Sequence, residues 1–457
     1  MSDPEKILVV GLGRAGLAAA SFAANSGHRV VVTDSRSRDN FQHILARLPE
    51  SVELELGGHR RESFLQADLI VVSPGVTWID ELKDAVDRGI PVIDEVQFAA
   101  SRIRGELVGV TGTNGKSTTT VLLGRMLERT GRPVFTGGNL GNPLTECLGT
   151  ESSREGGLVV AELSSFQLQR SPDIAPSVAV LLNLDEDHLD RHKDMEEYAD
   201  AKAMIFRNQT PDDWALVNGD QEICISLAKL NRGRLLLFSD GNKPHAGPGG
   251  YLDGDTIVVM PPGGGDEVRI SARSIPLQGR HNLANACAAA IVASLHGVGP
   301  DEIRNVLQTF EGLPHRMQKT GILGGVTFYN DSKATNVSAA VGSLGGLEGR
   351  VAVIAGGIHK GSSYRPLLAV LKDRCDGLVL IGEAAQNMKS ELGAAARVVM
   401  AGDMNEAVRE AYRLASPGGS VVLCPACSSY DMFKDYEQRG DAFVKAFSLL
   451  NRKETGR

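Results

Sequence analysis

Short apolar runs alternate with longer amphipathic segments along most of this chain. In the first hundred residues such runs lie at 7–10, 30–33, 69–73 and 91–93, each followed by a segment of helical character. Strand-length apolar runs that alternate with helix-like segments are typical of parallel strands joined by helical crossovers. The pattern therefore predicts a doubly wound parallel sheet at the N-terminus.

The same alternation recurs twice further along the chain. A second series of runs lies at 107–110, 133–136, 158–161, 178–182 and 215–217, and a third at 326–329, 351–355, 378–381 and 421–423. Residues 235–275, which include Pro-Pro-Gly-Gly-Gly at 261–265, read as β-structure and loops inserted before a helix at about 282–296. Gly312-Leu313-Pro314 reads as a linker between the second and third series.

A glycine-rich loop follows the run at 107–110 and precedes a helix-like segment at 119–130. Its sequence is Gly112-Thr113-Asn114-Gly115-Lys116-Ser117-Thr118. In such a loop the backbone N–H groups wrap a polyphosphate, the lysine reaches its terminal oxygens, and the serine hydroxyl can hold Mg²⁺. Val110 stands where the usual motif has its first glycine, so the loop is a variant. It predicts a nucleoside triphosphate substrate, and an ordinary turn before a helix is the alternative.

The first apolar run leads into a second glycine-rich turn, Gly11-Leu12-Gly13-Arg14-Ala15-Gly16. Asp34 ends the next run, as in the dinucleotide-binding fingerprint. Taken alone, this fingerprint indicates an NAD-dependent dehydrogenase. A dehydrogenase has no need of the loop at 112–118, whereas an enzyme that uses ATP and a nucleotide-linked substrate needs both. We therefore rank a uridine diphosphate above NAD at this turn, with a purely structural turn as the third possibility.

These patterns predict an α/β protein of three domains, as expected for 457 residues. We expect an N-terminal Rossmann-like domain over 1–97, a central domain with a P-loop ATPase-like parallel sheet over 98–312, and a C-terminal Rossmann-like domain over 313–457.

Composition narrows the class of partner. The net charge is −8 and no basic block is present, which disfavours binding to extended nucleic acid. The N-terminal residues do not resemble a signal peptide, and no apolar run approaches ~18 residues. The six cysteines are scattered, and only Cys424-Pro-Ala-Cys427 has redox or metal spacing, without a histidine cluster beside it. We expect a cytoplasmic enzyme, monomeric, that does not enter a membrane.

Two acidic segments follow strands of the predicted central sheet. Glu162 comes after the run at 157–161, where a carboxylate can reach a metal below the phosphate loop. Residues 183–192 contain four acids and two histidines. Ligands of open α/β sheets bind at the carboxyl ends of the strands, so this segment predicts a second metal or phosphate contact, for which we favour His188. A solvated acidic loop is the alternative.

Several of these segments together resemble the Mur ligase family, ATP-dependent amide-forming enzymes that build the peptide of bacterial cell-wall precursors. The resemblance extends from Gly11 to about Phe447. The segments that carry it are 112–118, Glu162–Gln167, 183–192, Gly279–Asn282 with Asn285, and Pro314–Arg316. Within the family, residues 330–336, 356–360, 425–431 and 437–440 are similar to those of members that add D-glutamate. The resemblance implies a ligase of peptidoglycan precursor synthesis that joins D-glutamate to UDP-N-acetylmuramoyl-L-alanine through an acyl phosphate.

The resemblance also implies roles for single residues at matching positions. The ATP contacts are Gly112, Thr113, Asn114, Gly115, Lys116, Ser117, Thr118, Asn282, Asn285, Arg316, Asp331 and Lys333. The uridine-substrate contacts are Asp34, Ser35, Arg36, Gly75 and Asn139, and the amino-acid contacts are Thr335, Lys360, Ser429 and Tyr430. The magnesium ligands are Ser117, Glu162, His188 and Lys202, the last as a carbamate. The catalytic set is Lys116, His188, Lys202, Arg316 and Asp331, with His188 or Asp331 as the proton acceptor.

Two positions depart from the family pattern, and three other functions stay open. Arg14 stands where apolar or small residues are usual, so it could steer the diphosphate or crowd the uracil, and Tyr436 replaces a phenylalanine. Lys202 has a simpler reading as a surface lysine on an amphipathic helix, and Lys360 as a solvated loop lysine. The competing functions are a family ligase for another amino acid or for folate, a nicotinamide oxidoreductase, and an ATP-dependent switch module.

Overall fold

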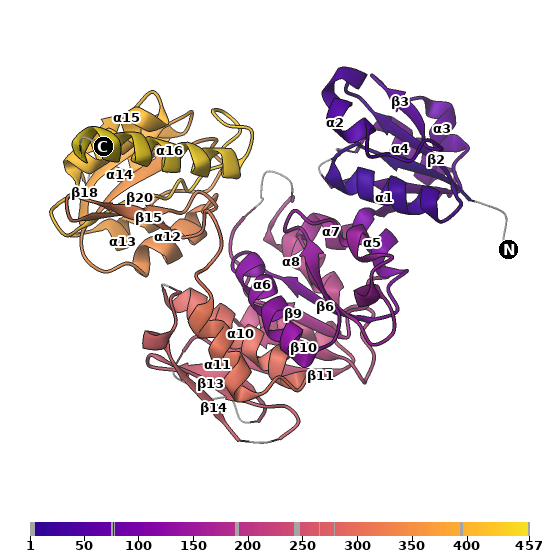
Figure 1. Cartoon of the computed structure of the whole chain (residues 1–457), viewed down its shortest axis with the longest axis horizontal. Helices are drawn as coiled ribbons and strands as arrows, with labels where there is room; N and C mark the ends of the chain where they lie inside the picture. Colours follow the sequence, from indigo (N-terminus) through magenta and orange to yellow (C-terminus); the bar gives the residue numbers. More distant parts are fainter. Residues whose placement is uncertain are drawn as a thin grey trace.

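Three β-sheets divide the chain into three consecutive α/β units. The computed structural model describes residues 5–74, 76, 78–187, 192–241, 247–264, 266–277, 279–393 and 396–455, without the side chain of His43. In Figure 1 the N-terminal unit (indigo) and the C-terminal unit (orange to yellow) lie above the central unit. The three-domain α/β fold is thus confirmed, whereas the boundaries after residues 97 and 312 stay predictions.

The N-terminal sheet is fully parallel, with strand order β3-β2-β1-β4-β5. The order reverses at β1, which pairs with β2 on one side and β4 on the other. Ligands of such sheets bind where the order reverses, which here is the turn after β1. The strands are β1 Lys6–Val10, β2 Arg29–Asp34, β3 Glu53–Leu56, β4 Leu69–Val72 and β5 Val92–Asp94, and the α-helices are α1 Arg14–Asn25, α2 Gln42–Leu45, α3 Arg61–Leu65, α4 Asp80–Asp87 and α5 Glu95–Ala100.

The central sheet has nine strands in the order β14-β13-β12-β11-β10-β9-β6-β8-β7. Its strands up to β12 pair in parallel, and the β-structure predicted within 235–275 is confirmed as β11 to β14, whose last two strands are antiparallel. The strands are β6 Glu106–Thr111, β7 Val134–Gly138, β8 Leu158–Glu162, β9 Val178–Leu181, β10 Trp214–Asn218, β11 Arg234–Ser239, β12 Gly249–Asp253, β13 Thr256–Met260 and β14 Val268–Ser271. The α-helices are α6 Lys116–Leu127, α7 Ser165–Gln169, α8 Met195–Ala203, α9 Glu222–Leu227, α10 Arg280–Leu295 and α11 Pro300–Thr309.

The C-terminal sheet has the order β15-β16-β20-β17-β18-β19, parallel except for the β15–β16 hairpin at its edge. Apolar side chains fill both of its faces, as a sheet covered by helices on two sides requires. The strands are β15 Gln318–Leu323, β16 Val326–Asn330, β17 Val351–Gly356, β18 Cys375–Ile381, β19 Val398–Met400 and β20 Ser420–Leu423, and the helices are α12 Val337–Gly345, α13 Pro366–Leu371, α14 Ala385–Leu392, α15 Met404–Leu414 and α16 Tyr436–Thr455.

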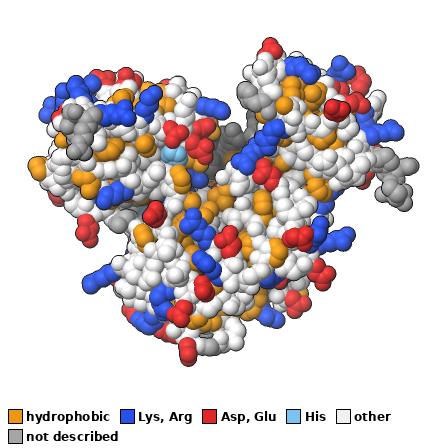
Figure 2. Space-filling view, in the orientation of Figure 1, with side chains coloured by type: hydrophobic (Ala, Val, Ile, Leu, Met, Phe, Trp, Pro, Cys, Tyr) orange, Lys and Arg blue, Asp and Glu red, His pale blue; other side chains and the backbone are white. Residues whose placement is uncertain are grey.

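The arrangement of the three units leaves a hollow between the N-terminal and C-terminal domains, above the central domain (Figure 2). Loops from the central and C-terminal sheets meet below the C-terminal domain, and side chains bond across that meeting point. Among the helices in the described ranges, none combines the length and apolar character needed to cross a bilayer.

Candidate active site between the central and C-terminal domains

The glycine-rich loop follows β6, as predicted, and its last three residues, Lys116 to Thr118, form the first turn of α6. Two of its glycines, Gly112 and Gly115, have φ angles of 150° and 82°. A Cβ atom at Gly115 would lie 2.2 Å from Asn285 Oδ1, so only glycine fits at this position. The Lys116 ammonium folds over the loop and donates 2.8 Å hydrogen bonds to the carbonyls of Gly112 and Thr113. The lysine is therefore placed where the loop would hold a phosphate.

Glu162 closes β8 and lies on the wall of the same cavity as Ser117. Its Oε1 accepts a 2.8 Å hydrogen bond from Asn139 Nδ2, whereas its buried Oε2 has no hydrogen-bond partner. Burial opposes ionisation, but the Lys333 and Lys116 ammonium groups keep the pKa of Glu162 below its ordinary value. A buried, ionised carboxylate with a free oxygen near a serine hydroxyl fits the oxygen ligands that Mg²⁺ prefers.

The structure describes only one of the other two predicted metal ligands, Lys202. His188 lies outside the described residues, and within those residues no three His, Cys, Asp or Glu side chains form a metal-binding group. Lys202, on α8, is 1% exposed and donates a 2.8 Å hydrogen bond to the Gly112 carbonyl, so it is not a surface lysine. Burial, with Lys116 nearby, lowers the pKa of Lys202 well below its ordinary value. Carbamate formation needs an uncharged amine, and the lowered pKa makes Lys202 easier to deprotonate.

The C-terminal domain contributes the opposite wall of the cavity. Lys333 Nζ donates a 2.9 Å hydrogen bond to Ser117 Oγ across the domain boundary, and burial lowers the pKa of Lys333 to about 8. Asp331 is 1% exposed and accepts a 3.0 Å hydrogen bond from the Met317 N–H, and burial raises its pKa to about 6. Arg316 lies just before β15 and lines the cavity, and its buried Nε has no hydrogen-bond partner. The arrangement concentrates positive charge above the glycine-rich loop.

The cavity has a volume of about 420 Å³, within the range of small-molecule sites. Most of the predicted ATP contacts line it, and α10 contributes Asn285. Gly112, Thr118 and Asn282 are not on its wall. Asn282 instead accepts a 3.4 Å hydrogen bond from Asn285, and Thr118 is buried in α6. The structure thus brings together predicted site residues from two domains: Thr113, Asn114, Gly115, Lys116, Ser117, Asn139, Glu162, Asn285, Arg316, Asp331, Lys333 and Thr335.

The predicted amino-acid contacts do not all share one place. Lys360 Nζ lies 3.5 Å from Asp187 Oδ1 with only 17% of its side chain exposed, so it is not a solvated loop lysine. Ser429 is buried, whereas Tyr430 is 71% exposed and is not on the cavity wall. Tyr430 therefore has no contact in this structure that supports a binding role.

Contacts between the two domains include residues that the sequence analysis did not single out. Asn336 donates a 2.7 Å hydrogen bond to Asp187, and Ser338 donates a 3.0 Å hydrogen bond to Asp185. Both aspartates belong to the acidic segment at 183–192, and Asn336 ends the segment at 330–336. The cluster of acids in the sequence pointed to a functional segment. It could not predict the partners of these acids, which lie far away in the sequence.

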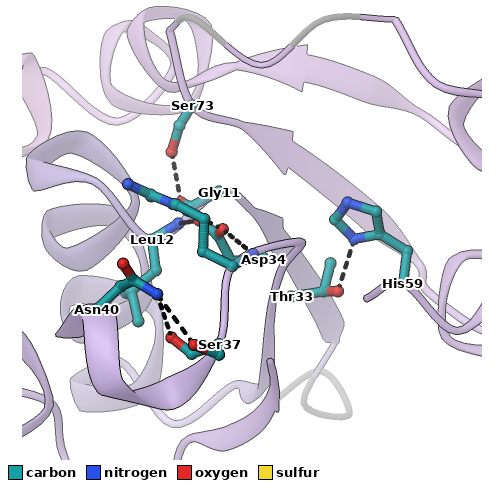
Figure 3. Close-up of polar contacts among 9 residues, drawn as sticks. Gly11, Leu12, Thr33, Asp34, Ser37, Asn40, His59 and Ser73 are labelled. Carbon is teal, nitrogen blue, oxygen red and sulfur yellow. Dashed lines mark hydrogen bonds and ion pairs between the residues drawn. The ribbon is translucent and has the colours of Figure 1, made fainter. Parts of the chain in front are cut away.

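A second polar site lies at the turn after β1 (Figure 3). Asp34 accepts hydrogen bonds from the Leu12 N–H at 2.8 Å and from the Arg36 guanidinium at 3.0 and 2.9 Å. Burial opposes ionisation, but the Arg36 hydrogen bonds lower the pKa of Asp34. Ser73 donates a 2.7 Å hydrogen bond to the Gly11 carbonyl, which brings the loops after β1 and β4 together. Ser35 is exposed beside this site, and Gly75 lies outside the described residues.

The two departures from the family pattern make specific contacts. The Arg14 guanidinium donates hydrogen bonds to Asn142 at 2.7 Å and to Glu146 at 3.2 and 3.3 Å, so it ties α1 to the 3₁₀ helix η3 (Leu144–Cys147) of the central domain. The Tyr436 hydroxyl donates a 3.2 Å hydrogen bond to Glu437, and its ring centroid lies 5.2 Å from Lys333 Nζ. Tyr436 thus supports a lysine of the cavity.

Comparisons with known proteins agree across all three domains. Residues 5–94 match the Mur ligase MurD-like N-terminal domain, residues 110–293 match the Mur ligase middle domain, and residues 315–427 match the Mur ligase glutamate ligase domain. Together these matches span most of the chain.

Similar whole chains include curated proteins named UDP-N-acetylmuramoylalanine–D-glutamate ligase. The protein of Geotalea daltonii is 42% identical over 448 residues, and that of Geotalea uraniireducens is 43% identical over 449 residues, each covering 98% of both chains. The protein of Thermoanaerobacter pseudethanolicus is 37% identical over 454 residues, covering 98% of this chain and 99% of its own.

Solved structures with a similar fold include a pseudomurein peptide ligase type C from Methanothermus fervidus and the UDP-N-acetylmuramate–alanine ligase MurC from Thermotoga maritima. Both give a TM-score of 0.62, with 19% and 18% identity, and each covers 98% of this chain and 100% of the solved chain. At that identity they support the fold alone. The matching domains and the full-length relatives show that this chain belongs to the Mur ligase family, the ATP-dependent ligases of peptidoglycan synthesis.

Proposed function

We propose that this protein joins D-glutamate to UDP-N-acetylmuramoyl-L-alanine with hydrolysis of ATP to ADP and phosphate. The relatives that are 37–43% identical over nearly the whole chain carry this activity in their names. The structural observation that carries the proposal is the cavity in which the glycine-rich loop of one domain meets Lys333, Arg316 and Thr335. The proposal includes a cytoplasmic location, because both ATP and the uridine-linked precursor are soluble nucleotides of that compartment.

The first step forms an acyl phosphate. A carboxylate oxygen of the L-alanyl group attacks the γ-phosphorus of ATP, the bond from that phosphorus to the bridging oxygen breaks, and ADP leaves. Phosphoryl transfer depends mainly on positioning and charge neutralisation. The cations proposed to neutralise this charge are Lys116 over the glycine-rich loop, Lys333 at Ser117, and Arg316 with its unpaired Nε.

Magnesium fits the side chains at one end of the cavity. Ser117 and the orphaned Oε2 of Glu162 would hold it, with His188 and a carbamate on Lys202 as further predicted ligands. When bound, the ion would supply additional positive charge to the phosphate oxygens.

The second step forms the amide. The uncharged amine of D-glutamate attacks the acyl carbon, phosphate departs, and the nitrogen loses a proton. Lys360, Thr335 and Ser429 are the groups proposed to hold the two carboxylates, through charge-assisted and hydroxyl hydrogen bonds. Asp331, with a pKa raised to about 6 by burial, can accept a proton near neutral pH, and His188 is the other candidate.

The uridine end of the precursor is proposed to bind at the N-terminal turn. Asp34 and Arg36 present one carboxylate and one guanidinium beside the Gly11–Gly16 turn, as a nucleoside diphosphate requires. Asn139 is then positioned near the reacting end, since it bonds to Glu162 in the central cavity.

A product assay tests this function. With ATP, UDP-N-acetylmuramoyl-L-alanine and D-glutamate, we expect one ADP and one phosphate per product molecule whose mass has increased by one glutamyl residue. Nucleotide binding without amino-acid-dependent turnover would favour the switch module. Hydride transfer with NAD(H) would favour the oxidoreductase, and either result would overturn the proposal.

A further inference from the structure

A buried cation in the C-terminal domain has no part in the reaction described so far. Arg439 lies in the first turns of α16 and is 1% exposed, and it is the largest of the fully buried side chains among the described residues. Burial lowers the pKa of Arg439 to about 10, so the guanidinium stays charged at neutral pH. Burying a charge is costly unless hydrogen bonds compensate for the lost water.

The hydrogen bonds of this guanidinium go to the loops that follow three different strands. After β16, Ser332 accepts bonds at its Oγ (3.0 Å) and at its carbonyl (2.8 Å). After β20, the carbonyls of Cys427 and Ser428 accept bonds at 3.1 and 3.3 Å. At the end of β17, the Gly356 carbonyl accepts a 3.4 Å bond. One side chain therefore joins three loops.

The same three loops carry the proposed substrate contacts. Ser332 immediately precedes Lys333 and lies near Thr335, Ser428 immediately precedes Ser429, and Gly356 begins the turn that reaches Lys360. Each bond from Arg439 thus lies within a few residues of a group that would touch the nucleotide or the amino acid.

The backbone of these loops is held in conformations that need support. Ala426 has a φ of 55°, in the left-handed region that residues other than glycine rarely adopt. A Cβ atom at Gly357 would lie 1.9 Å from the Ser428 carbonyl oxygen, and the Ile358 N–H donates a 2.9 Å hydrogen bond to that oxygen. Strained backbone of this kind persists only where the surroundings fix it, and it is common at binding sites.

We propose that Arg439 is a positioning residue that fixes the three amino-acid-binding loops relative to one another, and thereby sets how well the ligase binds D-glutamate. The inference rests on the proposed function. Arginine suits this task because its planar fork offers five donors in fixed directions, whereas lysine offers a single rotating ammonium. Arg439→Lys should therefore keep the positive charge but no longer hold the three loops at their present distances from one another.

The kinetic test uses three variants of the full chain. Arg439→Lys removes the guanidinium. Ser332→Ala removes the hydroxyl that accepts a hydrogen bond from Arg439 and donates a 2.7 Å hydrogen bond to the Tyr436 carbonyl. Arg374→Lys is the matched control, since Arg374 also donates to backbone carbonyls, those of Leu347 and Gly349, away from the three loops. Each is assayed for the KM of D-glutamate, ATP and the uridine substrate, below its measured Tm.

We expect Arg439→Lys to raise the KM for D-glutamate by about tenfold or more, because displacements near 1 Å carry penalties of this size. The KM for ATP should change by less than about threefold, because most of the proposed ATP contacts lie in the central domain, and among the three loops only the one after β16 carries any. Ser332→Ala should raise the KM for D-glutamate by a smaller factor. Arg374→Lys should leave the KM for D-glutamate unchanged even if the Tm of that variant falls.

An unchanged KM for D-glutamate in Arg439→Lys would overturn the inference, as would equal changes for all three substrates. A wild-type enzyme that does not use D-glutamate would instead overturn the proposed function. The two failures are therefore distinguishable in one set of assays.

Discussion

Burial gives several charged side chains of this protein properties that their sequence context did not indicate. Lys202 and Lys360 could both have been exposed lysines, yet one lies below the glycine-rich loop and the other pairs with Asp187 across a domain boundary. Glu162 combines a bonded oxygen with an orphaned one, which is what a metal ligand needs. The proposed function therefore rests on a few charged side chains that are largely buried.

Replacing Lys202 tests the predicted carbamate. Lys202→Ala should lose most of the ligase activity, about 100-fold, while its affinity for ATP changes little, because Lys202 contacts the loop carbonyl from below. Addition of short carboxylic acids to the assay should restore part of the activity by supplying the missing carboxylate. Full activity of the unsupplemented variant would rule out the carbamate.

Replacing Arg36 tests the uridine site. Arg36→Ala removes the partner of Asp34 and a cation that lies 4.6 Å from the centre of the Phe41 ring. The KM for UDP-N-acetylmuramoyl-L-alanine should rise by about tenfold while that for ATP stays within about twofold, since the two sites lie in different domains. Equal weakening of both substrates would assign Arg36 to another role.

At the scale of single elements, helix α5 links the N-terminal domain to the central domain. Helix α5 follows the last strand of the N-terminal sheet, and its N-cap Asp94 accepts a 2.8 Å hydrogen bond from the Val96 N–H. The next residue, Glu95, accepts 2.6 and 2.5 Å hydrogen bonds from the N–H and hydroxyl of Thr145 in the central domain. Through Glu95, this helix connects the N-terminal and central domains.

The buried carboxyl group of Asp94, the N-cap of α5, should make the stability of the protein depend on pH. Burial raises the pKa of Asp94 to about 8, so the folded protein holds a proton there that the unfolded chain releases above its ordinary value of 3.8. Stability from this group is complete at low pH and is lost as pH rises towards 8, by at most about 1.4 kcal/mol per pH unit. Asp94→Asn keeps the accepting oxygen and cannot ionise. The Tm of this variant minus the Tm of the wild type should therefore increase from pH 5 to pH 8. Parallel Tm curves would contradict this account.

The central strands were predictable from their apolar sequence, whereas the edge strands β3, β15 and β19 were missed. β1, β8 and β9 are buried on both faces, so their composition alone identified them. β3 and β15 contain the polar residues Glu53, Glu55, Gln318 and Lys319, and β19 has only three residues, so none of them forms a long apolar run. Backbone pairing, rather than hydrophobic pattern, determines such strands.

Contacts between domains could not be derived from the sequence for a related reason. Asn336 and Asp187 are 149 residues apart, and no local pattern couples them. Family resemblance supplied the predicted roles of Lys333 and Thr335. It supplied neither the bonds of Arg14 to Asn142 and Glu146 nor those of Arg439. Motifs identify chemistry, whereas the folded chain determines which motifs meet.

On the scale of the whole molecule, the central and C-terminal domains, which are proposed to carry the reaction, are in contact. Lys333 reaches Ser117, Asn336 reaches Asp187, and Lys360 lies beside the same aspartate. Since Asp331, Lys333 and Thr335 share one loop, nucleotide and amino acid would contact the same segment of the C-terminal domain. We therefore expect binding of the two substrates to be coupled.

Replacing Lys360 tests the amino-acid side of this coupling. Lys360→Ala should raise the KM for D-glutamate by at least about tenfold, through the loss of a charge-assisted bond to a carboxylate, while ATP binding changes little. D-Glutamine should be a poor substitute in the wild type for the same reason. Lys372→Ala, an exposed lysine of the same domain, is the matched control and should behave as the wild type. An equal loss of ATP affinity in Lys360→Ala would contradict the assignment.

The central claim is that this Mur ligase consumes ATP to add D-glutamate. Phosphate release measured with ATP, UDP-N-acetylmuramoyl-L-alanine and one amino acid at a time, from D-glutamate, L-glutamate, D-glutamine and L-lysine, tests it most directly. We predict rapid release with D-glutamate and little with the other three. A preference for L-lysine, or equal release with all four, would contradict the account.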